Sequence, residues 1–205
     1  SHTPSLASLS ALILGLFLSI AVSAANAQTL PDVQRLMTQN QMPQALEAVD
    51  TYIATKPKDA QGRFLRGLIL TEMGRSADAI AVFTKLTEDF PELPEPYNNL
   101  AVLYAQQKQY DKARTALEMA IRTHPSYSIA HENLGDVYAK LASQAYDKAL
   151  KLDSSNAATQ TKLSMIKELI STSSKPGGKP AASAAPAAEA AKTPPVAKAP
   201  ETKPI

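Results

Sequence analysis

Apolar side chains recur every three to four residues through the middle of the chain, between short polar turns. One such stretch runs from residue 60 to about residue 74, and a second runs from residue 79 to residue 86. Because a helix turns once in 3.6 residues, this spacing gives each stretch one apolar face. Gly74 and Pro91 then stand where helices commonly stop. The pattern predicts a pair of amphipathic helices with the apolar positions Phe64, Leu68, Ile69, Met73, Ala79, Ile80, Phe83 and Leu86.

The helix pair repeats along the chain. Proline closes successive pairs at Pro57, Pro91 and Pro125, which are separated by two equal steps. A constant step of this length, about 34 residues, is typical of stacked helical repeats. A weaker first copy covers residues 30–37 and 45–53, and Thr29 with Asp32 suits the beginning of its first helix. The second-helix alanine keeps the same step at Ala45, Ala79 and Ala113.

Two helices and two short turns in about 34 residues resemble the tetratricopeptide repeat. The resemblance covers residues 28–156 and includes the small residue of the first helix and the large residue three positions later. It implies an all-α, right-handed α-solenoid of about three and a half helix hairpins, in repeats near 28–59, 60–93, 94–127 and 128–156. The small residues are Gly67, Ala101 and Gly135, and the large residues are Leu70, Tyr104 and Tyr138.

The resemblance also implies a concave groove, lined by the first helix of each repeat, that holds a peptide or a helix of a partner protein. Each groove position is assigned from the matching position of the repeat. The alternative for each residue is ordinary solvated surface. The groove candidates are Gln61, Phe64, Leu68, Glu72, Glu95, Asn98, Asn99, Val102, Gln106, Ile129, Glu132, Asp136 and Lys140.

Family members that bind chaperones clamp a partner's terminal carboxylate with lysine and arginine in this groove. Here Glu95, Glu132 and Asp136 occupy much of the same surface, and acidic side chains repel a carboxylate. Asn99 and Asn133 match a common asparagine position that also occurs in members without the clamp. We therefore expect a partner of basic or mixed character.

The period fails after the third copy. Asp147 and Thr159 stand one full step after the last alanine and proline, whereas the pattern itself returns five residues early, at Ala142 and Ser154. Five residues are therefore missing, and they fall between the two helices of the last repeat. No glycine or proline interrupts residues 136–153.

The missing turn predicts one continuous helix from about His131 to Asp153, roughly 33 Å long; the alternative is a tight bend near Ser143 and Gln144. A continuous helix leaves an apolar stripe to be covered, either by a capping helix over residues 157–170 or by a second copy, giving a homodimer through residues 131–153. The stripe is Leu134, Tyr138, Leu141, Ala145, Ala149 and Leu152, and the capping side chains are Leu163, Ile166, Leu169 and Ile170.

Both ends of the chain differ from the repeats. Residues 11–22 form an uncharged apolar run, and Ala25-Asn26-Ala27 follows as a cleavage motif, which predicts a secretory signal over residues 1–27 or an uncleaved membrane anchor. Either predicts an exported chain, in the bacterial periplasm or anchored facing it. Residues 171–205 hold seven prolines, ten alanines and five lysines. This composition predicts a disordered tail, which is either a solubilising extension or a weak contact with anionic envelope polymers.

Composition excludes several functions. Residues 28–170 carry 16 basic and 17 acidic side chains, which is not the charge of a nucleic-acid binder. The chain has no cysteine, its seven glycines are scattered, and we find no catalytic constellation and no cofactor motif. His131, Glu132 and Asp136 would make a thin metal site, and we expect His131 to serve packing instead.

These observations predict a non-catalytic protein–protein interaction scaffold that acts through its groove in cell-envelope assembly or secretion. The alternative is a homo-oligomeric or envelope-tethering protein that acts through the last helix and the tail.

Overall fold

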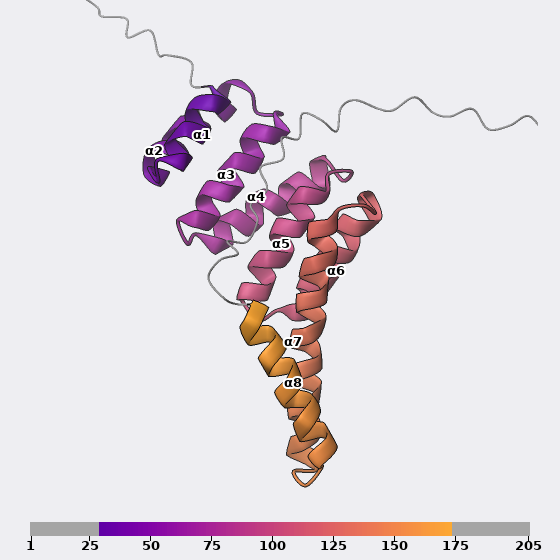
Figure 1. Cartoon of the computed structure of the whole chain (residues 1–205). Coiled ribbons are helices and arrows are strands. Elements are labelled where there is room, and N and C mark those ends of the chain that lie inside the picture. The colour runs from indigo at the N-terminus through magenta and orange to yellow at the C-terminus, as the bar shows by residue number, and fades with distance from the viewer. Residues whose placement is uncertain (1–28, 174–205) are drawn as a thin grey trace, which may run out of the picture.

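The structure, a computed structural model, describes residues 29–173, which form eight helices and no strand (Figure 1). Each helix packs against the next along the chain, and α1 also contacts α3 while α5 contacts α7. This is the all-α solenoid that the repeats predicted. The expected targeting segment and residues 174–205 of the expected tail lie outside the described residues. The helices are α1 (Leu30–Thr38), α2 (Met42–Thr55), α3 (Ala60–Glu72), α4 (Ser76–Asp89), α5 (Pro94–Gln106), α6 (Tyr110–Thr123), α7 (Ser128–Leu152) and α8 (Ala157–Ser173).

The first three helix pairs close through the same turn. Asn40, Gly74 and Lys108 stand at the same position of successive repeats and have φ angles of 56°, 72° and 60°, the left-handed region that ends many helices. The amide that follows each of them donates to the carbonyl five residues earlier, for example from Arg75 to Leu70 at 2.9 Å. Each turn therefore reverses the chain and seats the second helix on the first.

A different turn joins one pair to the next, and it occurs four times. It begins at Lys56, Phe90, His124 and Asp153, with φ near −140° at each. The amide three residues later donates to the carbonyl of each of these residues. The first two intervals between these turns are equal, and the third is five residues shorter. The last repeat therefore keeps the turn at its end, and the missing five residues fall inside the repeat.

The predicted long helix is confirmed. α7 runs without interruption for 25 residues, three residues further towards the N-terminus than expected, and no bend occurs at Ser143 or Gln144. Among the described residues, no helix is both long enough and apolar enough to span a bilayer.

The predicted helix start at Thr29 is also confirmed. Its side chain accepts a hydrogen bond from the amide of Asp32, and the Asp32 carboxylate accepts one from the amide of Thr29. This reciprocal capping box satisfies two amides that would otherwise lack partners at the beginning of α1.

The core runs through the first three repeats and reaches Ala130 and Val137 of α7. Its fully buried side chains include Phe83, Leu65, Ile69, Leu103 and Leu117. The Phe64 ring meets the Phe83 ring edge to face, with centroids 5.6 Å apart. The apolar faces predicted for these helices therefore do form the interior.

One close contact explains the glycine at the small position of α3. A Cβ added at Gly67 would lie 2.6 Å from the ring of Phe83, so only glycine admits this ring. At Gly135, the same position of α7, an added Cβ would meet nothing within 4 Å. No second helix folds back onto α7 at Gly135, as α4 does onto α3 at Gly67.

The α8 helix packs on α7, but beside the predicted stripe. Tyr138, Ala145, Ala149 and Leu152 stay exposed, and Leu169, expected to cover the stripe, is 55% exposed. The turn at 153–156 sets the direction of α8, which therefore lies on the adjacent face of α7. The half-buried or buried side chains between the two helices are Ala139, Ser143, Tyr146 and Leu150 of α7 and Leu163, Ile166 and Ile170 of α8.

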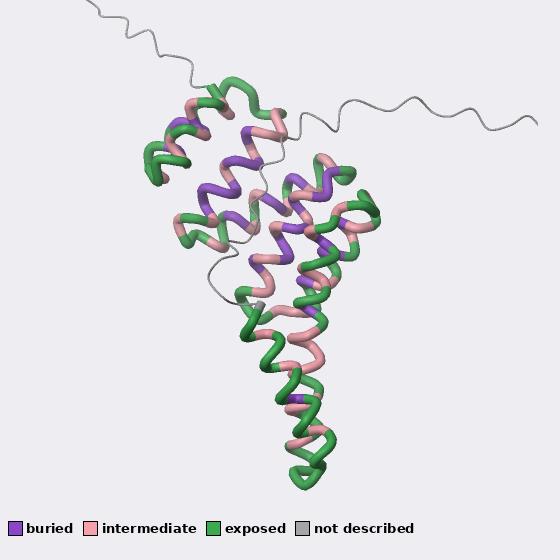
Figure 2. The backbone as a smooth tube through the Cα atoms, in the orientation of Figure 1, coloured by how far each residue is buried: buried purple, intermediate pink, exposed green. Residues whose placement is uncertain are grey.

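The α7–α8 hairpin projects from the solenoid, and Figure 2 shows that exposure predominates along its far half. α8 ends at Ser173, whereas the composition predicted disorder from Ser171. The hydroxyls of Ser171 and Thr172 donate to carbonyls of the preceding turn, and the first proline of the tail comes only at Pro176. The helix therefore continues three residues further.

Two glycine-to-alanine substitutions test this arrangement. Gly67→Ala should lower the free energy of unfolding by about 1–3 kcal/mol, because the buried Phe83 ring must move. Gly135→Ala should raise it by up to about 1 kcal/mol, because alanine favours a helix and the site is open. Urea denaturation of both variants is the measurement; equal losses at the two positions would contradict the open end at α7.

Candidate functional site

Among the first helices of the repeats, which the resemblance assigns to the groove, α1 contacts α3 and α5 contacts α7. A hydrogen bond joins two of them, since the Asn133 amide of α7 donates to Oδ1 of Asn98 on α5 at 2.8 Å. Asn98 is only 2% exposed. The bond therefore helps to fix the spacing of the two helices.

The predicted groove residues differ in accessibility. Phe64, Leu68 and Asn98 are buried, so in this structure they support the solenoid from within. Their contact with a partner remains a prediction. Gln61, Glu95, Asn99, Val102, Ile129 and Lys140 are half-buried, and Glu72, Gln106, Glu132 and Asp136 are exposed.

The accessible side chains at the predicted groove positions are therefore mainly acidic. Glu72, Glu132 and Asp136 are exposed on α3 and α7, and Glu95 is half-buried on α5. Lys140 is the basic side chain among the predicted positions, and it is half-buried. The arrangement favours cationic groups on whatever enters the groove.

Glu95 is held in an unusual position. Its Oε2 atom is buried and accepts no hydrogen bond from the part of the chain that the structure describes. Partial burial, and secondarily the charge of Glu95, raise the pKa of Tyr127 to about 12. The phenol therefore stays neutral beside the carboxylate at physiological pH.

Sequence reasoning missed Tyr127 and misjudged His131. Tyr127 lies in the turn before α7, a segment in which no helical spacing marks a residue. His131 is exposed rather than packed, and one of its ring nitrogens lies 2.9 Å from the carbonyl of Pro125. Among residues 29–173, no three His, Cys, Asp or Glu side chains are placed to hold a metal ion.

The Asn99 side chain forms a hydrogen bond within its own helix. Its amide donates to the carbonyl of Glu95, four residues earlier in α5, at 2.9 Å. Asn133, at the matching position of α7, instead reaches Asn98. The two asparagines thus have different roles although the repeat gives them one position.

A cavity of about 430 Å³ lies on another part of the solenoid, between α2, α3 and α4. Four cations line it, and each has a carboxylate partner at 2.7–2.9 Å. Asp89 serves two of them, and Lys85 also lies 3.3 Å from Glu88, so four carboxylates balance the four cations and the cavity offers little net charge to a ligand. The groove remains the better candidate. The pairs are Arg63–Asp89, Arg66–Asp50, Arg75–Asp78 and Lys85–Asp89.

Helix pairs that stack one on the next through a recurring turn define a helical-repeat protein. The comparisons with known proteins then give the family. Two tetratricopeptide repeat models match the chain, one over residues 33–94 and one over residues 70–136. The chain belongs to the tetratricopeptide repeat family, whose members are generally non-catalytic scaffolds for protein–protein interaction.

Individual relatives are distant. The chain is 32% identical over 87 residues to the chloroplastic tetratricopeptide repeat domain-containing protein PYG7 of Arabidopsis thaliana, covering 40% of this chain and 29% of that protein. It is 28% identical over 120 residues to ER membrane protein complex subunit 2 of Xenopus tropicalis, covering 55% of this chain and 40% of that protein. The chain thus spans well under half the length of these curated relatives.

Among solved structures, a MamA fragment from Desulfovibrio magneticus RS-1 matches with a TM-score of 0.51 at 22% identity. The match covers 68% of this chain and 84% of that one. Likeness at this identity supports the fold, a tetratricopeptide solenoid.

The bond between Asn98 and Asn133 has a measurable consequence. Asn133→Ala should lower the free energy of unfolding by about 1–3 kcal/mol, because it leaves the buried Oδ1 of Asn98 without a donor. The double variant with Asn98→Ala should lose less than the sum of the single losses, by at least about 0.5 kcal/mol. Asn99→Ala is the matched control and should cost less. Strict additivity in the double-variant cycle would contradict the bond.

Proposed function

We propose that the chain is a scaffold whose groove binds a peptide or helix of basic or mixed character on a partner protein. The observation that carries the proposal is the set of accessible groove side chains, in which Glu72, Glu132 and Asp136 are exposed and Lys140 is half-buried. Family membership supports an interaction role, and the charges select the kind of partner.

The buried oxygen of Glu95 strengthens this choice. A buried acceptor without a donor costs about 1–3 kcal/mol, which a partner's donor would recover only after the Glu95 side chain turns outward. A lysine or arginine side chain is the natural donor, because it brings both hydrogen-bonding protons and the opposite charge. A terminal carboxylate would instead meet four acidic groups.

Short synthetic peptides test the proposal directly. A lysine-rich peptide should bind the whole chain more tightly than a glutamate-rich or serine-rich peptide of equal length, and added salt should weaken its binding. Glu132→Lys with Asp136→Lys should weaken that binding about tenfold, because each exposed charge pair contributes about 0.5–1 kcal/mol. Fluorescence anisotropy gives the affinities.

A matched double variant distinguishes a loss of binding at the groove positions from an effect of net charge alone. Glu47→Lys with Glu92→Lys makes the same change in charge at exposed positions on α2 and in the loop before α5. This control should bind lysine-rich peptides nearly as well as the wild type. An equal loss in both double variants, or no preference for lysine, would refute the groove as the site.

We further propose that this scaffold works outside the cytoplasm, in bacterial cell-envelope assembly or secretion, and that the tail lysines contact anionic envelope polymers weakly. The proposal rests on the apolar run and cleavage motif of residues 11–27 and on the composition of residues 171–205, all read from the sequence.

Cleavage at the proposed site gives a simple outcome. Mass spectrometry of the protein recovered from its native cells should find Gln28 as the first residue, in a fraction outside the cytoplasm. Intact protein with residues 1–27 attached, found in the cytoplasmic fraction, would overturn the proposal.

A further inference from the structure

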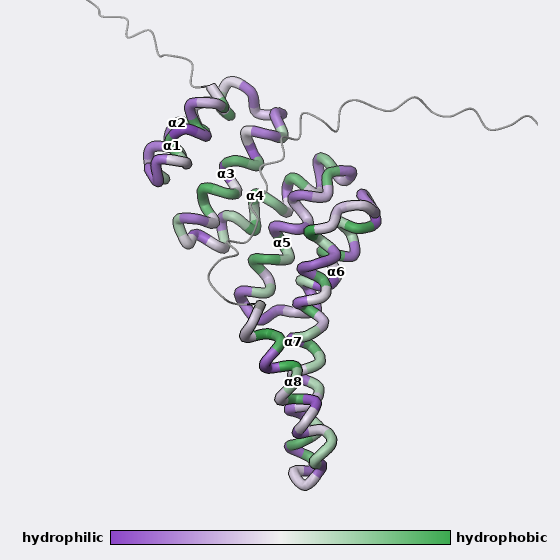
Figure 3. Tube along the Cα trace, viewed as in Figure 1, coloured by the Kyte–Doolittle hydropathy of each residue, from purple (hydrophilic) through white to green (hydrophobic). Residues whose placement is uncertain are grey.

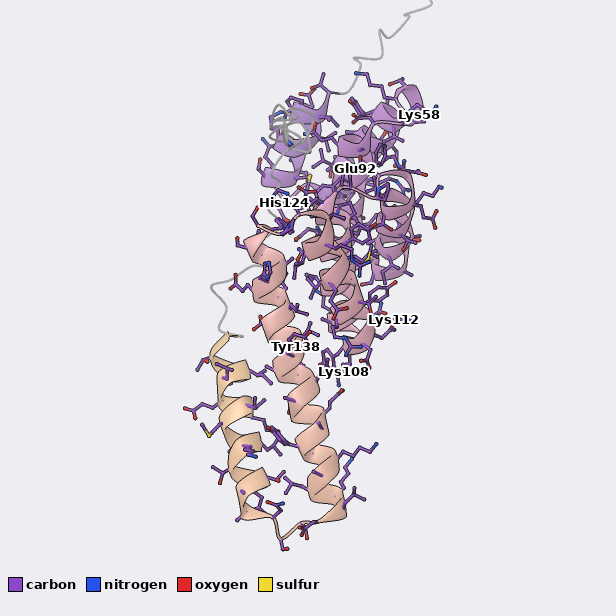
Figure 4. All side chains as sticks on the ribbon, turned by 90° about the vertical axis from the view of Figure 1, so that its right-hand side faces the viewer. Lys58, Glu92, Lys108, Lys112, His124 and Tyr138 are labelled. Carbon is purple, nitrogen blue, oxygen red and sulfur yellow. The ribbon has the colours of Figure 1, made fainter. Side chains whose placement is uncertain are left out.

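The α7–α8 hairpin carries the large apolar side chains that the fold leaves uncovered. The four exposed large hydrophobic residues of the described chain all lie there: Tyr138 at 48%, Leu152 at 85%, Met165 at 66% and Leu169 at 55% exposure. Figure 2 shows that the hairpin is largely exposed, and Figure 3 shows hydrophobic segments along it. Figure 4 places Tyr138 near the middle of α7.

An ion pair shows how the two helices are turned towards each other. Nζ of Lys167 lies 3.2 Å from Oδ1 of Asp147. Lys167 follows the inward-facing Ile166 by one residue, and Asp147 follows the inward-facing Tyr146 by one residue. In both antiparallel helices, the residue that follows an inward-facing residue therefore lies on the same side of the hairpin.

A step of one residue backward must then lead to the opposite side in both helices. Met165 and Leu169 precede the inward-facing Ile166 and Ile170, and Ala145 and Ala149 precede Tyr146 and Leu150 in the same way. These residues consequently share one side, which we call the hairpin face. Tyr138 and Leu152 lie seven residues, about two turns, before and after Ala145, so they fall on the same side. The hairpin face therefore consists of Tyr138, Ala145, Ala149 and Leu152 of α7 with Met165 and Leu169 of α8.

The hairpin face is almost free of charge. Lys140, Asp147 and Lys151 each follow an inward-facing residue of α7, so they lie on the opposite side. Lys162 of α8 shares the side of the hairpin face, near the loop, where its long stem allows the ammonium to reach water. An uncharged apolar surface of this kind suits burial against a similar surface.

The spacing of large and small side chains makes the hairpin face complementary to itself. Tyr138 and Leu152 lie four helical turns apart on α7, about 21 Å, with Ala145 midway between them. A second copy running in the opposite direction, related by a two-fold axis at Ala145, would place the partner's Leu152 against Tyr138 and the partner's Tyr138 against Leu152. The alanines between them allow the helices to approach closely.

The size of the hairpin face suits a reversible pair. A surface about 21 Å long and two helix diameters wide buries on the order of 1,000 Å² in total when two copies meet, at the lower end of specific interfaces. We propose that the chain forms a two-fold dimer through the hairpin face, with a dissociation constant in the micromolar range. The dimer does not depend on the groove, but it joins two grooves and gives bivalent binding.

Sedimentation of the full chain across a concentration series tests the dimer. The wild type should pass from monomer to dimer, and Leu152→Glu with Met165→Glu should weaken dimerisation at least tenfold while circular dichroism stays unchanged. Gln144→Glu with Ser164→Glu is the matched control, because both residues are exposed, off the hairpin face, and bring the same change in charge. The control should dimerise like the wild type.

A crosslink checks the geometry independently, since the chain has no cysteine. Ala145→Cys should oxidise readily to a disulfide-linked dimer, because the two-fold axis brings the two copies of this residue within disulfide distance. Gln144→Cys should not. Wild type that remains monomeric at high micromolar concentration overturns the proposal, as does a dimer that Leu152→Glu with Met165→Glu leaves intact.

Discussion

The solenoid depends on one constraint, the reversal of the chain between the two helices of each repeat. In three repeats a residue in the left-handed conformation, Asn40, Gly74 or Lys108, makes this turn, and a backbone bond across five residues closes it. Where the turn is made, the second helix packs onto the small residue of the first, as the Phe83 ring does on Gly67. Where five residues are lost, α7 cannot reverse, and α8 becomes its neighbour instead.

The spacing of Pro57, Pro91 and Pro125 was enough to predict the helix pairs, because a repeat carries its local rules with it. The continuous α7 also followed from sequence, since a deletion removes a turn whatever surrounds it. The face on which α8 lies could not be predicted in the same way. Ile166 and Leu169 are both apolar and three residues apart, and the direction of the turn after Asp153 decides which of them is covered.

The groove residues, too, could be predicted only in part from the sequence. The repeat gives each first helix its groove positions, but the packing between helices decides whether the side chains remain accessible. Asn98 became buried because Asn133 on α7 bonds to it, and Phe64 because Phe83 meets its ring. What remains accessible is the acidic set with Glu132 and Asp136, so the structure moves the emphasis from apolar contact to charge.

The continuity of α7 is the central claim, and one distance tests it. Spin labels on cysteines introduced at Ser128 and Lys151, both exposed, would lie about 35 Å apart on an unbroken helix. Pulsed electron paramagnetic resonance on labelled protein diluted with unlabelled protein should give a single narrow distribution near that value. A distance of roughly 10–20 Å, as in a hairpin whose second half folds back onto the first, would contradict the account.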